Sequence, residues 1–280
     1  MNSPIKWFGG KGRQTRRLLP LIPPHKVYVE PYAGGASLFF AKPPASIEVL
    51  NDLNYDIFNL YSVLRDPEAA DHLRELLELT PYSQNEFDAA VEQMGGACRV
   101  EHARCFFVRC QQAFGGRVFD RPSWSRDSGT GMRTTKRNAY LNAITRRPDV
   151  HAQLRQGQIE NRPALELLPV YDSPETFFYL DPPYMAATRR GGGYPHEMSD
   201  DDHRALVDAI LSVKGKVMLS GYENEIYREL ERGGWRRIEY QACVHINNVT
   251  DAASRGRTEC VWLNYAPAQN SFRWAEDDAA

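Results

Sequence analysis

Long hydrophobic runs are absent from this 280-residue sequence, so no segment is expected to cross a membrane as a helix. The sequence begins Met1-Asn2-Ser3-Pro4, which is not the start of a secretory signal peptide. Cysteine is also scarce, because the 5 cysteines are scattered and include no C-x-x-C pair. This distribution argues against a disulfide framework and a zinc site. We therefore predict a cytoplasmic protein with free thiols and without a bound metal.

An excess of positive charge is missing as well, since the formal net charge is −2. The charge is unevenly distributed, however. Between Ala97 and Arg155 there are 12 Lys and Arg against 4 Asp and Glu, a net charge of +8, which leaves −10 for the rest of the chain. Aromatic residues lie among these arginines, Phe114 and Trp124 among them. A basic block of this kind is typical of a surface that contacts nucleic-acid phosphates, although an ordinary solvated face is the alternative.

The most informative motif is the tetrapeptide Asp181-Pro182-Pro183-Tyr184, which follows the apolar run 177–180. The run predicts a buried strand, and the prolines end it because proline cannot continue a sheet ladder. A carboxylate, a carbonyl and an aromatic ring are thus expected at the carboxyl end of a strand, where open α/β sheets bind ligands. Two acceptors beside a ring suit a flat group that bears an amino group, such as a nucleobase. A proline-rich strand exit capped by an aspartate is the alternative.

Two predicted strands lie upstream of that motif. Residues 27–30 form the first, which leads through the turn Gly34-Gly35 into a helix, and residues 47–51 form the second, which ends at Asp52. Glu30 and Asp52 are 22 positions apart, close to the spacing at which a Rossmann-type unit places an acid on ribose hydroxyls. The loop lacks the G-x-G-x-x-G pattern of dinucleotide-binding proteins. We therefore predict a cofactor that contains one nucleoside.

Together these motifs resemble those of the Dam-type (D12 class) DNA adenine-N6 methyltransferases, over about residues 6–265. Residues 6–11 resemble the family's K-W-x-G-G-K element, and residues 30–36 its E-P-F-x-G-x-G loop with Ala36 in place of the last glycine. Residues 51–54 resemble its N-D-x-N element, and residues 257–265 its closing strand. The order of the motifs is that of the alpha group, in which the recognition insert lies between the cofactor loop and the D-P-P-Y motif.

The resemblance implies S-adenosyl-L-methionine as the cofactor and double-stranded DNA as the partner. It implies Asp181, Pro182 and Tyr184 as the catalytic residues. The implied cofactor contacts are Trp7, Lys11, Glu30, Pro31, Tyr32, Gly34, Gly35, Ala36, Ser37, Asp52, Asn161 and Asp181. The implied DNA contacts are Arg109, Phe114, Gly115, Arg117, Arg121, Trp124, Arg126, Lys136 and Arg137. A cognate restriction endonuclease is a candidate partner, and we expect a monomer or a weak dimer.

The expected fold is α/β: a mixed, mostly parallel Rossmann-like methyltransferase sheet with an inserted, mainly helical target-recognition domain. Residues 1–65 are predicted to form the cofactor-binding half, 66–155 the insert, 156–268 the catalytic half and 269–280 an acidic tail. Within the insert, helices are predicted over Ala103–Phe114 and Asn138–Ile144. The sheet is expected to resume at 158–160 and to end with paired strands over 238–244 and 259–265.

The exocyclic amine of adenine is a poor nucleophile, because its lone pair is delocalised into the ring. The Asp181 carboxylate and the Pro182 carbonyl are expected to accept its hydrogens, which exposes the lone pair and stabilises the charge that develops on nitrogen. Tyr184 is expected to stack on the base. The base must first leave the duplex, because its amine is otherwise paired.

Besides Ala36, two departures from the family pattern are visible, together with one glycine-rich stretch. Gly115 stands where the family usually has an asparagine, after the aromatic position that Phe114 fills, so a recognition sequence other than GATC is expected. Arg162 replaces the aromatic residue that usually lies beside the cofactor adenine. The stretch 189–193 is glycine-rich, as in a mobile lid or a plain surface loop.

Three alternative functions fit parts of this pattern. A cytosine-N4 methyltransferase uses the same chemistry but more often has serine at the position of Asp181. A non-catalytic DNA-binding module would not need Lys11, Asp52 and Asp181 together. A protein-glutamine methyltransferase usually has N-P-P-Y and no basic insert.

Overall fold

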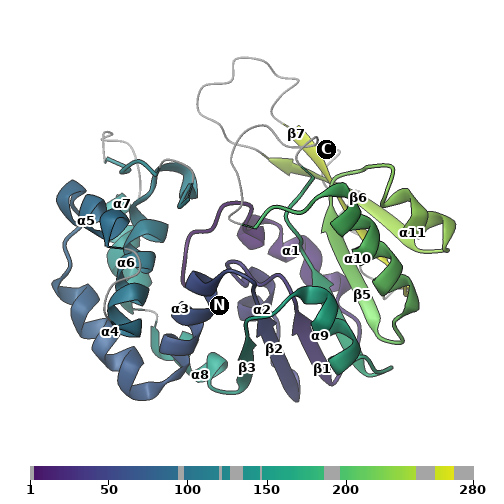
Figure 1. Cartoon of the computed structure of the whole chain (residues 1–280), viewed down its shortest axis with the longest axis horizontal. Coiled ribbons are helices and arrows are strands. Elements are labelled where there is room, and N and C mark those ends of the chain that lie inside the picture. The colour runs from purple at the N-terminus through teal and green to yellow at the C-terminus, as the bar shows by residue number, and fades with distance from the viewer. Residues whose placement is uncertain are drawn as a thin grey trace.

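The computed structural model describes residues 3–93, 98–119, 122–126, 135–145, 147–185, 196–243 and 256–267. A seven-stranded sheet with the order β3-β2-β1-β4-β5-β7-β6 runs through the larger part of the molecule (Figure 1). Its first five strands are parallel, and β7 is antiparallel to both β5 and β6. The strands are β1 (Val27–Glu30), β2 (Ile47–Asn51), β3 (Gly157–Glu160), β4 (Thr176–Leu180), β5 (Lys216–Gly221), β6 (Arg236–Cys243) and β7 (Gly256–Leu263).

Helices cover both faces of the sheet, which explains why its central strands are apolar at consecutive positions. Every residue of β4 is buried, and Phe177 and Phe178 belong to hydrophobic clusters on opposite faces. One face packs against α1 (Thr15–Leu18), α2 (Ser37–Ala41) and α3 (Tyr55–Arg65). The other packs against α9 (Ala164–Tyr171), α10 (Asp200–Ser212) and α11 (Arg228–Arg232). The predicted α/β fold with a mixed, mostly parallel sheet is thereby confirmed.

A group of helices lies at one end of the sheet, on the left of Figure 1. It consists of α4 (Pro67–Leu79), α5 (Gln84–Glu92), α6 (Arg99–Gln112), α7 (Lys136–Thr145) and α8 (Arg147–Leu154). Its central helix α6 is almost entirely buried from Cys105 to Gln112. The same hydrophobic cluster includes Phe106 of α6 and Phe39 of α2, so the core is continuous from the helices to the sheet. The domain boundaries at 65 and 155 stay a prediction.

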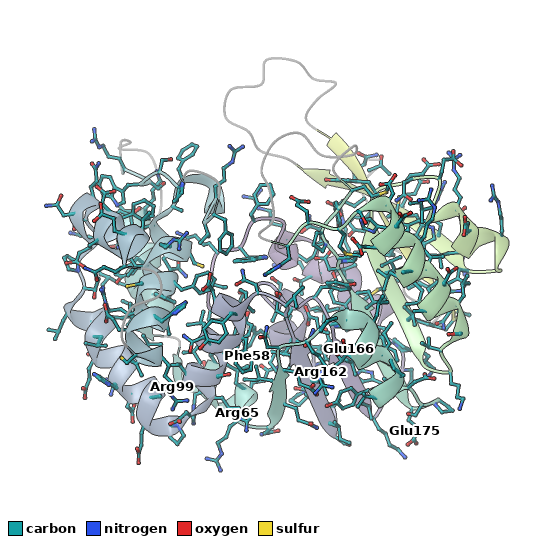
Figure 2. The ribbon with its side chains drawn as sticks, viewed as in Figure 1. Phe58, Arg65, Arg99, Arg162, Glu166 and Glu175 are labelled. Carbon is teal, nitrogen blue, oxygen red and sulfur yellow. The ribbon has the colours of Figure 1, made fainter. Side chains whose placement is uncertain are left out.

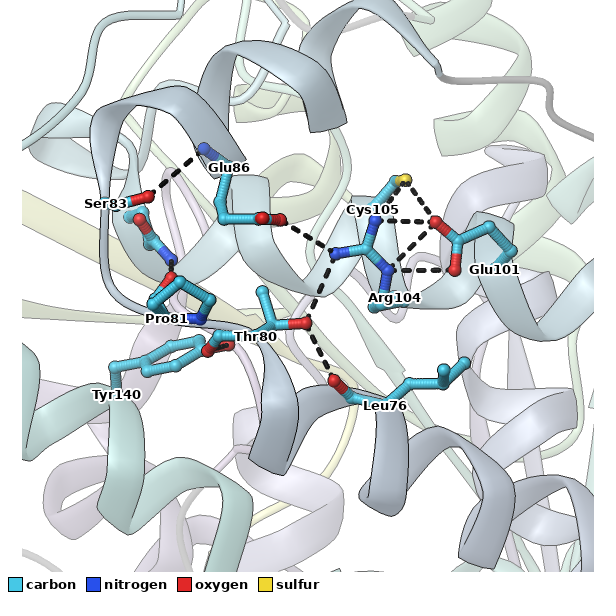
Figure 3. Close-up of polar contacts among 10 residues, drawn as sticks. Leu76, Thr80, Pro81, Ser83, Glu86, Glu101, Arg104, Cys105 and Tyr140 are labelled. Carbon is cyan, nitrogen blue, oxygen red and sulfur yellow. Dashed lines mark hydrogen bonds and ion pairs between the residues drawn. The ribbon is translucent and has the colours of Figure 1, made fainter.

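Arg104 of α6 joins several helices of this group (Figure 3). Its guanidinium donates to both carboxylate oxygens of Glu101 on the same helix, contacts Glu86 of α5, and lies 3.3 Å from the Thr80 hydroxyl. The Thr80 carbonyl accepts a hydrogen bond from Tyr140 of α7 at 3.1 Å. This arginine of the basic block therefore holds the insert together instead of facing a partner.

Helix α6 begins earlier than the sequence predicts and ends earlier too. It starts at Arg99, where the Cys98 sulfur accepts a bond from the Glu101 amide, and it ends at Gln112 instead of Phe114. The reason for the early end is that Ala113 leaves the helix to form an antiparallel bridge with Trp124. Phe114 thus lies beyond the helix, in a short 3-10 turn over Phe114–Gly116. Within the described part of the chain, no helix is both long and apolar enough to span a membrane.

Candidate active site

A cavity of about 260 Å³ opens at the carboxyl ends of β1, β2 and β4. Parallel strands bring these ends to one edge of the sheet, which is where the sequence predicted the site. Most of the predicted cofactor residues line this cavity: Trp7, Lys11, Glu30, Pro31, Tyr32, Gly34, Gly35, Ala36, Ser37, Asp52 and Asp181. The cavity also has lining residues that the sequence did not single out, including Leu53, Leu165, His196 and Asp202.

The turn after β1 is shaped by the indole of Trp7. Gly34 has a φ of +46°, and a Cβ placed on it would lie 2.6 Å from the Trp7 Nε1 atom. The far side of the indole contacts Phe106 and Phe119 edge-on, at centroid distances of 6.1 and 5.7 Å. Trp7 is therefore held between the turn and the helical insert, and only glycine fits at position 34.

Ala36, which stands in place of the family's last glycine, is also left-handed, with a φ of 48°. It is the one non-glycine residue with positive φ among the residues described. Left-handed backbone costs an alanine about 1–2 kcal/mol relative to its ordinary conformations. The substitution thus keeps the shape of the family's loop and adds local strain.

Asp52 follows β2 and connects that strand to the turn. Its Oδ2 atom accepts the Gly34 amide at 2.8 Å, and its Oδ1 atom accepts the Asn54 amide at 2.9 Å. Burial raises the pKa of Asp52 to about 6, although both amide bonds lower it. The carboxylate still has lone pairs for a ligand in the cavity, because each oxygen can accept more than one bond.

Asn161 lies behind this loop instead of in the cavity. Its side-chain amide donates to the carbonyls of Asp52 and Leu53, at 2.7 and 3.0 Å. The next residue, Arg162, which is labelled in Figure 2, lines the cavity. Its Nε atom pairs with the Glu160 Oε2 atom at 2.7 Å. The Asn161 side chain thus supports the loop that holds Asp52, and its contact with the cofactor stays a prediction.

Asp181 forms an ion pair with Lys11, whose Nζ atom lies 2.7 Å from the Asp181 Oδ1 atom. Both side chains are largely buried, with 5% and 17% exposed for Lys11 and Asp181. Burial raises the pKa of Asp181, and the positive charge of Lys11 opposes that rise. Lys11 was predicted to bind the cofactor. In the structure, its positive charge compensates the negative charge of Asp181, the carboxylate predicted to be catalytic.

Tyr184 lies next to this ion pair, with the Lys11 Nζ atom 4.6 Å from the centre of its ring. Its hydroxyl donates to the Oε2 atom of Glu259 on β7 at 2.8 Å. The ring of Tyr222 meets it edge-on at 4.8 Å. Glu259 was not predicted as a site residue; the only sequence signal is a carboxylate directly before the apolar run 260–263. Pro183 lines the cavity, and Pro182 is buried.

Glu30 is a further buried carboxylate at this edge, with 2% of its surface exposed. The Tyr28 hydroxyl donates to its Oε2 atom at 2.8 Å. Burial raises the pKa of Glu30 to about 8, and the nearby charge of Asp181 acts in the same direction. Near neutral pH, Glu30 is thus expected to hold a proton in the free protein.

The predicted DNA contacts gather around the turn after α6. Phe114 is 63% exposed, and the Lys136 Nζ atom lies 6.0 Å from the centre of its ring. The ring nitrogen of Trp124 donates a hydrogen bond to the Gln112 Oε1 atom at 3.1 Å. The Arg126 guanidinium lies 6.0 Å from the centre of the Trp124 ring. The side chains of Arg117, Arg126 and Arg137 are exposed. We call Phe114, Arg117, Trp124, Arg126 and Lys136 the basic tip.

Gly115 explains one departure from the family pattern. Its φ is +65°, and a Cβ there would meet nothing within 4 Å. Asparagine is among the few other residues that enter this conformation readily. The exchange of asparagine for glycine therefore preserves the turn and removes a side chain from its exposed surface.

One predicted DNA contact is buried, unlike the residues of the basic tip, and another cannot be placed. Arg109 is buried, donates to the Val118 carbonyl and lies 5.7 Å from the centre of the Phe119 ring. Burial lowers the pKa of its guanidinium. Its contacts are thus with the segment after α6, and its contact with DNA stays a prediction. Arg121 and the stretch 189–193 lie outside the described residues.

Comparison with known proteins agrees with this geometry. Residues 7–246 match the model of a family described as D12 class N6 adenine-specific DNA methyltransferase. The chain is also similar to the Type II methyltransferase M1.LlaDCHI of Lactococcus lactis subsp. cremoris. The two are 27% identical over 298 residues, which cover 93% of this chain and 94% of the relative.

Because Trp7 packs against Gly34, one methyl group added at position 34 should strongly lower the stability of the fold. Gly34→Ala should lower the free energy of unfolding by about 1–3 kcal/mol, because the alanine is left-handed and its Cβ collides with the indole. Gly12→Ala is the matched control, since a Cβ there meets only the Ser37 hydroxyl at 3.9 Å. Urea denaturation measures both. In a Trp7→Ala background the cost of Gly34→Ala should shrink, and an unchanged cost would mean that the indole is not the obstacle.

The burial of Glu30 predicts a pH dependence of stability. Its folded pKa of about 8 lies above the ordinary 4.5, so the folded state holds the proton more tightly. Glu30 therefore stabilises the fold below about pH 4.5, and this stabilisation is lost as the pH rises to about 8. The slope contributed by this group approaches about 1.4 kcal/mol per pH unit. Urea titrations from pH 5 to 8 should give a flatter profile for Glu30→Gln than for the wild type; equal slopes would contradict the assignment.

Proposed function

Because the chain belongs to the D12 class of N6 adenine-specific DNA methyltransferases and methylates adenine in DNA, we propose that S-adenosylmethionine is its methyl donor and binds in the cavity at the sheet edge. One observation carries this proposal. Asp52, the turn packed on Trp7, and the Lys11–Asp181 pair come from distant parts of the sequence and line a single cavity of about 260 Å³.

The residues around the cavity fit this donor. Asp52 would accept hydrogen bonds from the ribose hydroxyls, because its carboxylate keeps lone pairs beyond those bonded to Gly34 and Asn54. Leu53 and Leu165 line the cavity with 47% and 40% of their surfaces exposed, and would cover the faces of the cofactor adenine. The carboxylate of Glu30 would accept the donor's ammonium group, a cation that would also favour its ionised form.

When bound, S-adenosylmethionine supplies a methyl group activated by its sulfonium. The protein must then hold the target amine in line with that group. Asp181 would accept one hydrogen of the amine and the Pro182 carbonyl the other, so Asp181 exchanges Lys11 for the substrate. The positive charge that develops on nitrogen strengthens both bonds, which is the source of the rate acceleration. Tyr184 would stack on the base.

The basic tip supports extraction of the target base from the duplex. Its aromatic residue Phe114 is exposed, Lys136 lies 6.0 Å from the centre of that ring, and Arg117 and Arg126 are exposed nearby in the chain. Gly116, at the end of the same turn, lies against the backbone of Trp7 and Phe8, which line the cavity; a Cβ on Gly116 would be 3.6 Å from the Phe8 nitrogen. A duplex held by the tip would thus lie next to the cavity, with Phe114 placed to fill the space that a flipped base leaves.

A role in restriction and modification is a further proposal. The similar Lactococcus protein is named a Type II methyltransferase, and enzymes of that kind protect DNA from a cognate endonuclease. We therefore propose that this chain protects a specific sequence from such a partner in the cytoplasm. Methylation-sensitive sequencing of DNA from cells that express the chain would reveal the sequence.

Removal of the Asp181 carboxylate should abolish methyl transfer. Asp181→Ala is expected to lower the rate by at least about 10²–10³, because the amine loses the acceptor that stabilises its developing charge. Transfer of label from S-adenosylmethionine to N6 of adenine, measured after digestion to nucleosides, checks the rate. Duplex affinity serves as the control and should persist, since the basic tip is unchanged. A mutant that methylates adenine at close to the wild-type rate would overturn the mechanism.

Duplex binding should depend strongly on salt, because the basic tip displaces counterions from phosphates. Arg117→Ala and Arg126→Ala should each lower the slope of log K against log salt by about 1. Arg74→Ala on α4 is the matched control: that arginine is also exposed but pairs with Asp71 and Glu78, so the slope should not change. Fluorescence anisotropy of a labelled duplex at several salt concentrations measures the slope. Equal slopes for all three variants would remove the tip from the interface.

A further inference from the structure

A second carboxylate lies behind the ring that is expected to hold the target base. Glu259 is only 6% exposed, and its Oε2 atom accepts the Tyr184 hydroxyl at 2.8 Å across 75 positions of sequence. Burial raises the pKa of Tyr184, and the charges of Asp181 and Glu259 raise it further. The hydroxyl therefore keeps its proton and acts as the donor of this bond.

The position of Glu259 on the sheet makes this contact specific. Glu259 lies opposite Tyr240 of the neighbouring strand β6. The next residue, Cys260, is the first residue of β7 that also pairs with β5. Side chains alternate along a strand, so Glu259 shares a face with Val261 and Leu263, which are buried in the apolar core. A carboxylate at the end of an apolar stripe is costly unless it is bonded. Here the bond goes to the aromatic residue of the D-P-P-Y motif.

Tyr184 is held from three directions in the free protein. Glu259 binds its hydroxyl, Tyr222 meets its ring edge-on at 4.8 Å, and the Lys11 ammonium lies 4.6 Å from the centre of its ring. A base that stacks on the ring and bonds to Asp181 takes over the contacts that Lys11 makes. The bond to Glu259 is made by the hydroxyl, which also interacts with Asp181, and a base that stacks on the face of the ring leaves that hydroxyl bonded to Glu259.

We propose that Glu259 is a positioning residue for methyl transfer: by accepting the Tyr184 hydroxyl, it fixes the ring against which the flipped adenine stacks. This inference rests on the proposed role of Tyr184 as the stacking residue. Glu259 acts through Tyr184 and touches neither the base nor the donor. Its removal should therefore affect the alignment of the base more than the affinity for S-adenosylmethionine.

The test compares Glu259→Ala, Glu259→Gln and Tyr184→Phe. Methylation of plasmid DNA gives kcat and KM, and the same plasmid, sequenced for methylation, gives the target site. A duplex with 2-aminopurine at the target adenine then reports stacking without the donor. Glu259→Ala and Tyr184→Phe should each lower kcat by about tenfold, the effect expected from loss of a hydrogen bond to a charged group. They should also raise 2-aminopurine fluorescence, because a base that leaves the ring is less quenched.

Two comparisons distinguish positioning from a general loss of structure. Glu259→Gln should recover most of kcat, because an amide oxygen still accepts the hydroxyl, and the double variant Tyr184→Phe/Glu259→Ala should be no slower than either single variant. Glu239→Ala is the matched control: this carboxylate lies on the neighbouring strand, 48% exposed and paired with Arg237, and its loss should leave kcat and fluorescence unchanged. Calorimetry should show the same donor affinity for all variants.

The inference would be overturned if the losses in kcat of the two single variants multiplied in the double variant. It would also be overturned if Glu259→Ala and Tyr184→Phe both kept wild-type kcat and fluorescence. The failure of the proposed function would appear differently. If the wild type itself left 2-aminopurine stacked in the duplex, or did not use S-adenosylmethionine, the proposed site would be wrong before any variant was compared.

Discussion

The ion pair between Lys11 and Asp181 is the interaction on which the rest of the site depends. Asp181, Glu30 and Glu259 bring three carboxylates into the poorly solvated edge of the sheet, and burial raises the pKa of the first two. An ionised carboxylate there needs a cation or several donors. Lys11 meets that need at 2.7 Å, and in the proposed mechanism the target amine takes its place. Burial and the nearby charge of Asp181 raise the pKa of Glu30 to about 8, which favours its neutral form near pH 7.

The segment that supplies Lys11 also connects the cofactor turn to the recognition helices. Lys6 donates to the Gln111 carbonyl of α6 at 3.0 Å, and the Gln111 side chain donates to the Pro4 carbonyl at 2.9 Å. Trp7 fills the space between Gly34 and Phe106. A shift of α6 on a duplex would therefore move the indole, the turn and Lys11 together. Because close-packed side chains transmit displacement, these contacts would couple the proposed DNA-binding surface to the proposed catalytic carboxylate.

Local signals in the sequence were sufficient to locate the sheet edge, but they could not reveal the partners of its side chains. The strands ending at Asp52 and Asp181 follow from apolar runs and prolines, and parallel pairing brings their ends together. Glu259 was missed because its role depends on a contact across 75 positions. The burial of Arg109 was not foreseen, because charge composition does not distinguish an exposed guanidinium from one buried against Phe119. Long-range packing decides both cases.

The two departures from the family's glycine and asparagine pattern have one physical explanation. Positions 36 and 115 are both left-handed, with φ of 48° and 65°. Gly115 adopts this conformation without strain, whereas Ala36 adopts it at a cost of about 1–2 kcal/mol. That cost is tolerable because Ala36 is 1% exposed and its amide donates to the Ala33 carbonyl at 2.6 Å, so the surrounding core holds the turn. At these two positions, the left-handed backbone conformation, and not a particular side chain, decides which residues are tolerated.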